Sequence, residues 1–145
     1  MNTGIQAFDQ SLEPTKEWIK EVQHELHYAN PEDAYASLRA VLHVLRDRLT
    51  VQEACDLGAQ LPLLLKGVYF DGWKTAHKPV KITEPQEFYG RVHQAMRGRQ
   101  EYDPERITQA VFKVITRHVS SGEIDDVKNM LPEGLTELLV RAAKE

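Results

Sequence analysis

The sequence is poor in the features that mark secreted, metal-binding and membrane proteins. Cys55 is the only cysteine among 145 residues, which excludes an intrachain disulfide framework and a Cys-rich zinc site. No run approaches the roughly 18 consecutive apolar residues of a membrane-spanning helix. The first ten residues lack the basic and apolar stretches of a secretory signal. We therefore expect a soluble, reduced protein of the cytoplasm that does not associate with membranes.

Motifs that carry catalysis or hold cofactors are also missing. The chain has no G-x-S-x-G, no Walker loop, no G-x-G-x-x-G and no H-E-x-x-H. Glu21 and His24 have the Glu-x-x-His spacing of di-iron bundles, but they lie on the polar side of their predicted helix. The acidic residues around Glu53 and Glu123 suit the first turns of helices, where negative charge is favoured. The sequence thus predicts no enzyme, no cofactor and no metal site.

A repeat at an offset of 70 residues organises the chain. Over positions 17–26 and 40–69, ten of forty residues are identical to those 70 positions later, including Pro62 and Pro132. Core positions and helix-ending residues recur together, which is the mark of a duplication. We predict a single domain, 1–145, built from tandem repeats 12–70 and 84–143 that are joined by an irregular linker, 71–83.

The starts of the first two helices recur in both halves. Prolines are favoured in the first turn of a helix because their fixed φ suits it, and Asn and Asp are favoured caps. We expect the first helices to begin at Pro14 and Pro85. The second helices should begin at Asn30-Pro31 and at Asp103-Pro104.

The third helix of each half has its own pattern. Both copies open on a hydroxyl residue followed three positions later by Glu, at Thr50 and at Ser120, which predicts a capping box in which each side chain bonds the other's backbone amide. Pro62 and Pro132 should kink or break these helices. The chain is therefore predicted to be all-α, a bundle of two three-helix repeats, about six helices in total, with pseudo-two-fold symmetry.

The run LRAVLHVLRDRLTVQEACDLGAQLPLLLKGVYFDGW, residues 38–73, resembles the uncharacterised bacterial DUF2267 family. The Leu-rich helix, the capped turn, the AQLP break and the Tyr-x-x-Gly-Trp ending occur in register, and the resemblance extends over about residues 17–140. It implies a compact helical domain from bacteria or archaea and implies no activity. The second half departs from the pattern because it has no counterpart of residues 69–73.

That unduplicated segment supplies the first candidate site. Its aromatic side chains follow a predicted helix and are too apolar to be left in water, and Gly72 permits the chain to turn back. One interpretation is a latch that covers the end of the core. The alternative is a cleft for a protein partner or a small apolar ligand, lined by Trp18, Tyr69, Phe70 and Trp73.

An uneven charge distribution supplies the second candidate site. The net charge of −4 argues against non-specific phosphate binding, but residues 91–119 carry six basic and three acidic side chains. The resulting basic patch contains Arg97, Arg99, Arg106, Lys113 and Arg117. The acids at the start of the following helix would face phosphates, so nucleic acid is a disfavoured partner. We expect a non-catalytic protein-interaction or ligand-binding module, with a nucleic-acid-binding regulator as the alternative.

Overall fold

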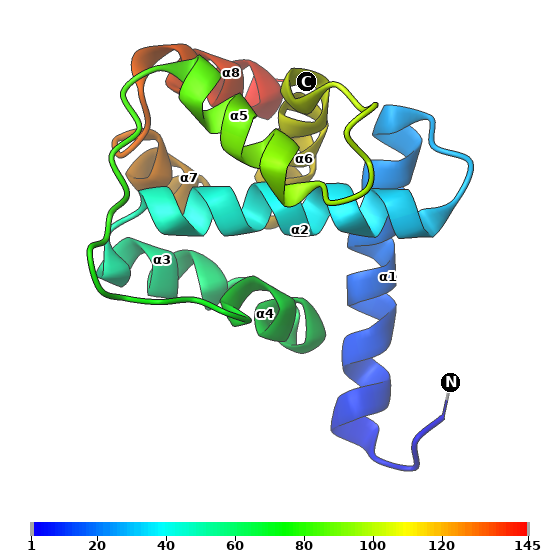
Figure 1. The fold of residues 1–145 in the computed structure, drawn as a ribbon. Coiled ribbons are helices and arrows are strands. Elements are labelled where there is room, and N and C mark those ends of the chain that lie inside the picture. Colours follow the sequence, from blue (N-terminus) through cyan, green and yellow to red (C-terminus); the bar gives the residue numbers. More distant parts are fainter. Residues whose placement is uncertain (1, 145) are drawn as a thin grey trace.

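The computed structural model describes residues 2–144, which form eight α-helices and no strand (Figure 1). The all-α prediction is confirmed. The helices are α1 Gln6–Leu26, α2 Pro31–Arg48, α3 Val51–Gly58, α4 Leu63–Phe70, α5 Pro85–Ala95, α6 Pro104–His118, α7 Ser121–Lys128 and α8 Glu133–Lys144. Among these residues no helix has the length and apolar character needed to cross a membrane.

Three of the four predicted helix starts are confirmed. Helix α2 begins after Asn30, whose side chain accepts a hydrogen bond from the Asp33 amide at 3.0 Å. Helix α6 begins after Asp103, whose side chain accepts one from the Glu105 amide at 3.0 Å. Helix α5 begins at the predicted proline.

The predicted start at Pro14 is wrong, because α1 begins at Gln6 and contains Pro14 in its interior. A proline there removes one amide donor and leaves the carbonyl four residues earlier, that of Gln10, without its helical partner. Gln10 is exposed, so water can bond that carbonyl. The N-terminal turns of α1 project beyond the other helices (Figure 1), where this solvation is available.

Two proline breaks raise the number of helices from about six to eight. Helix α3 ends at Gly58 and α4 begins after Pro62. In the second half, α7 ends at Lys128 and α8 begins at Glu133, directly after Pro132. Because proline cannot donate to the carbonyl of the preceding turn, each predicted third helix becomes two short ones.

The capping boxes at Thr50 and Ser120 are half formed. Thr50 Oγ1 accepts from the Glu53 amide at 3.2 Å, and Ser120 Oγ accepts from the Glu123 amide at 3.3 Å. The predicted return bond from the Ser120 amide to the Glu123 carboxylate does not form, because the Ser120 amide donates to Gln60 Oε1 at 2.7 Å instead. The Glu123 carboxylate is therefore released from the cap.

We expect Thr50→Ala and Ser120→Ala each to lower the free energy of unfolding by about 0.5–2 kcal/mol, the usual loss of an N-cap bond. Ser120→Ala should be the more costly variant because Ser120 Oγ also accepts from Gln60 Nε2 at 3.0 Å. Urea denaturation measures both. Ser121→Ala, at the neighbouring exposed position, is the control, and equal midpoints for all three variants would contradict the assignment of the caps.

Both halves contribute to one core. Helix α2 packs against α1 and α4 of its own half and against α5 and α6 of the other, and α1 also contacts α6. The ring of Trp18 stacks on that of His118, with centroids 4.7 Å apart. The connecting segment after α4 is anchored to α2, where the Val80 amide donates to the Asp47 carbonyl at 2.8 Å, and it inserts the buried side chain of Ile82.

Candidate anion-binding site

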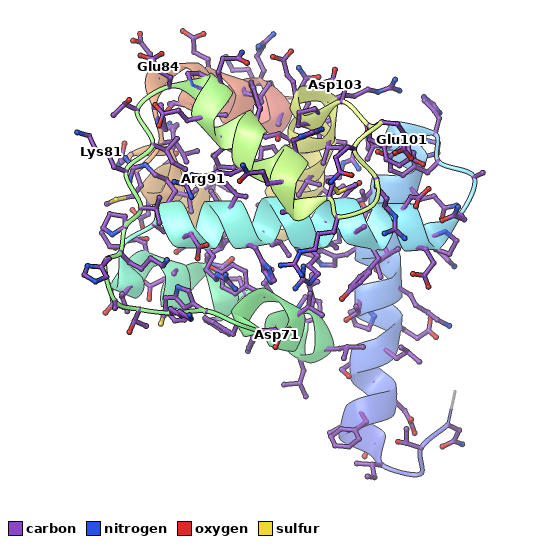
Figure 2. All side chains as sticks on the ribbon, viewed as in Figure 1. Asp71, Lys81, Glu84, Arg91, Glu101 and Asp103 are labelled. Atoms are coloured by element: carbon purple, nitrogen blue, oxygen red, sulfur yellow. The ribbon has the colours of Figure 1, made fainter. Side chains whose placement is uncertain are left out.

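A hollow of about 390 Å³ lies beside α2, between α5 and the turn that follows α4. Figure 2 shows Arg91 on α5 and Asp71 at the end of α4, on opposite sides of α2. We call this hollow the basic hollow because four of its lining side chains are arginines. Its charged and imidazole side chains are Arg39, His43, Arg46, Asp47, Asp71, Arg91 and Arg97.

Helical periodicity places the α2 residues of the basic hollow together. Arg39, His43, Arg46 and Asp47 follow one another at intervals of four, three and one residues, which puts them on one side of a helix. The neighbouring residues Leu38, Leu42 and Leu45 are buried, so the same helix presents an apolar side to the core and a basic side to the hollow.

Arg46 is a structural member of the hollow. It is only 5% exposed, and its Nη1 donates to the Tyr69 carbonyl at 2.7 Å and to the Asp71 carbonyl at 3.0 Å. Its Nε also pairs with Asp47 Oδ1 at 3.0 Å. These bonds satisfy carbonyls at the end of α4, which have no helical partner, and they fix the turn that forms one wall.

His43 is a second fixed donor. Its Nε2–H donates to the Val68 carbonyl at 2.7 Å. Burial, with a contribution from the nearby charges of Arg46 and Arg39, lowers the pKa of the imidazole. A neutral ring that already donates to a carbonyl is committed to holding α4 against α2, so it is not available as a general acid.

The other three arginines of the basic hollow differ from Arg46 in their ion pairing. Arg39, Arg91 and Arg97 make no ion pair within 4 Å among residues 2–144, whereas Asp47 is already occupied by Arg46 and by Lys78 at 3.8 Å. The side chains that line the hollow include four arginines and two aspartates, so their net charge is +2. A guanidinium presents paired donors that match the oxygens of phosphate and carboxylate groups.

The predicted aromatic cleft is only partly assembled. Tyr69, Phe70 and Trp73 lie together, with successive ring centroids 4.8 and 5.4 Å apart. Tyr69 is fully buried and donates from its hydroxyl to the Ala54 carbonyl at 2.7 Å. Trp18 instead lines a separate hollow of about 460 Å³ between α1 and the α3–α4 turn, to which the other three aromatics do not contribute.

The predicted basic patch is also divided. Arg99 pairs with Asp33 at 2.7 Å and Lys113 pairs with Glu25 at 3.7 Å. Arg117 pairs with Glu25 and with Glu21 of α1, and its guanidinium holds the pKa of the Glu25 carboxyl below its usual value. The acidic first half thus covers three of the five basic residues, and of the other two only Arg97 lines the basic hollow.

Exposed apolar side chains gather on another part of the surface. Phe8 and Leu63 are each 55% exposed, and Leu64 is 46% exposed. Together with Leu12 they line an apolar groove of about 360 Å³ between the start of α1 and α4. A protein partner would find its apolar contacts here rather than at the buried Tyr69.

Sequence reasoning missed Arg39, Arg46 and Arg91 as members of a site. Their spacing along α2 and α5 was visible, but polar residues opposite an apolar stripe are the usual solvated side of a helix. The hollow forms only because α5 and the turn after α4 pack beside this polar side of α2. The one signal available was the number of arginines on a side of α2 that has few acids.

The family model described as an uncharacterised conserved protein, DUF2267, matches residues 15–138. No curated protein matches the chain significantly.

Proposed function

Since the chain belongs to the DUF2267 family, whose description names no activity, we propose a function from the geometry: a non-catalytic module that binds a small phosphorylated ligand in the basic hollow. The observation that carries this proposal is that Arg39, Arg91 and Arg97 line one hollow, and that none of the three pairs with an acid within 4 Å among residues 2–144. Guanidinium groups from α2 (Arg39) and from α5 (Arg91) can donate to the same phosphate.

The character of the lining supports binding rather than chemistry. No hydroxyl or thiol side chain lines the basic hollow, so a nucleophile paired with a base is not available there. His43 and Arg46 hold backbone carbonyls of α4. Asp47 is held by two cations, which leaves it no role as a free base.

We also propose that the two halves are tandem repeats related by a pseudo-two-fold axis. Thr50 and Ser120 cap α3 and α7 in the same way, and prolines break the chain at equivalent places. Helices α3 and α7 contact each other, which is expected of equivalent elements that lie next to such an axis.

Binding of pyrophosphate to the full-length protein tests the proposed function. Arg39→Gln and Arg91→Gln should each weaken the affinity by about tenfold or more, because each removes a charge-assisted hydrogen bond worth about 1.5–3 kcal/mol. Arg106→Gln is the matched control: it makes the same charge change at an exposed position of α6 outside the hollow, and its affinity should stay within about twofold. Isothermal titration calorimetry measures all four proteins.

Two outcomes would contradict the proposal. Equal losses in all three variants would indicate a general charge effect, and no heat with folded wild-type protein would show that the hollow binds no phosphate. A DNA duplex that binds more tightly than pyrophosphate, with affinity falling steeply as salt rises, would instead support the nucleic-acid alternative.

A further inference from the structure

Carboxylates from the two halves gather where α3 meets α7. Glu53 and Asp56 belong to α3, and Glu123 belongs to the first turn of α7. One oxygen from each of these three residues lies within 4.8 Å of the other two. Figure 1 shows α3 and α7 at the same end of α2. This acidic cluster, Glu53, Asp56 and Glu123, is thus placed at a contact between the two halves, and none of its residues lines the basic hollow.

Glu123 is buried although no cation among residues 2–144 pairs with its carboxylate. Its exposed fraction is 7%, and within the described residues its Oε1 has no hydrogen-bond partner; the same holds for Glu53 Oε2. A buried acceptor without a partner is costly, and an ionised one more so. The structure therefore holds unsatisfied carboxylate oxygens inside a contact between helices, and these oxygens independently point to a cation-binding site.

The surrounding negative charges further disfavour the ionised form of Glu123. Burial, followed by the charges of Glu53, Asp56 and Asp126, raises the pKa of the Glu123 carboxyl to about 7. Burial and the charges of Asp126 and Asp56 raise the pKa of Glu53 as well. The nearby Lys128 pairs with Asp125 at 3.3 Å and does not compensate the cluster. Capping does not account for Glu123 either, because Gln60 occupies the Ser120 amide.

We propose that Glu53, Asp56 and Glu123 bind one calcium ion between α3 and α7. Carboxylate oxygens without sulfur or imidazole are the ligands of hard cations. Ca²⁺ accepts oxygens at about 2.3–2.6 Å in a flexible arrangement, whereas Mg²⁺ demands about 2.0–2.1 Å in a near-ideal octahedron. The three oxygens lie within 4.8 Å of one another, so they can reach one ion together, and the larger, less demanding Ca²⁺ suits them better. Asp56 keeps one oxygen for the ion while its Oδ1 accepts from Gln52 Nε2 at 2.9 Å.

The ion would join the two halves. Its ligands come from equivalent helices of the proposed repeat, with Glu53 and Glu123 at corresponding positions 70 residues apart. Because it satisfies oxygens that are otherwise buried without partners, binding should stabilise the folded chain. The site is independent of the proposed phosphate ligand, since it shares no residue with the basic hollow.

Calorimetric titration of EDTA-treated, full-length protein with CaCl2 tests this inference. We expect one site per chain with a Kd between about 10 µM and 1 mM, and weaker binding of MgCl2. At ten times Kd, Ca²⁺ should raise the Tm by about 4–6 °C. Glu123→Gln should weaken Ca²⁺ binding at least about tenfold, because the charge of the ligand set governs affinity, and in EDTA its Tm should be no lower than that of the wild type.

Asp125→Asn is the matched control, because Asp125 is exposed on the same helix, carries the same charge and lies outside the cluster. Its affinity should stay within about twofold of the wild type. If Glu123→Gln does not fold, Glu53→Gln decides the question by the same criteria. The proposal is overturned if folded wild-type protein shows neither heat nor a Tm rise up to about 10 mM CaCl2, in which case the carboxyls only share a proton. It is also overturned if Glu123→Gln binds Ca²⁺ as tightly as the wild type.

Discussion

Replacing Tyr69 with alanine should lower the free energy of unfolding by about 3–5 kcal/mol, the usual loss when a large buried aromatic is removed. The Tyr69 ring is fully buried, it packs edge-on against Phe70, and its hydroxyl donates to the Ala54 carbonyl of α3. Through these contacts it holds α4 against α3. Urea denaturation monitored by circular dichroism measures the loss.

Two variants separate the parts of this effect. Tyr69→Phe keeps the ring and should cost only about 0.5–1.5 kcal/mol, the net value of one hydrogen bond. Phe8→Ala removes an aromatic that is 55% exposed and should change stability by less than about 0.5 kcal/mol. If Tyr69→Ala unfolds at the same urea concentration as Phe8→Ala, residues 69–73, of which Tyr69 and Phe70 lie in the last turn of α4, do not act as a latch.

A fragment that contains only residues 84–145 should not fold cooperatively. In the full chain α5 and α6 pack against α2, and α6 also packs against α1. The side chains of Phe88 and Phe112, which are fully buried, would lose much of this cover. A chain of about 60 residues buries only about 60% of its unfolded surface even when its core is complete, so the fragment has little stability to lose.

Thermal unfolding followed by circular dichroism tests the fragment. We expect a broad, shallow transition for 84–145 alone and a gain of helical signal when an equimolar fragment 1–83 is added. A sharp cooperative transition for 84–145 alone would show that the halves are independent domains and that the shared core is not needed.

Local sequence rules predicted the helix class and the N-caps, but they placed Pro14 among the prolines that begin helices. Pro31, Pro85 and Pro104 begin helices, and Pro62 precedes one. Pro14 obeys the same local rule yet lies inside α1. The difference is the solvent around the preceding turn, which depends on how far α1 projects from the other helices, and this is not visible in the residues near Pro14.

The basic hollow and the acidic cluster were less predictable because the residues of each are distant in sequence. Thr50 and Ser120 accept the expected bonds from the backbone amides of Glu53 and Glu123. The Glu123 carboxylate does not accept the expected return bond, because Gln60, sixty residues earlier, occupies the Ser120 amide. Arg46 is bound to carbonyls more than twenty residues away, at Tyr69 and Asp71. Periodicity along one helix predicts which side a residue occupies, but it does not predict which helix or turn packs beside it.

The most direct test of the central claim is the mapping of bound pyrophosphate by NMR. Backbone amide and arginine side-chain resonances of the ¹⁵N-labelled protein would be followed during the titration. The proposed function predicts that the largest shifts occur at Arg39, Arg91, Arg97 and the Asp71–Gly72 turn, with small shifts at Arg106 on α6. The largest shifts at Arg106, or at Phe8 and Leu63 of the apolar groove, or no shifts at saturating pyrophosphate, would contradict the claim that the basic hollow is the binding site.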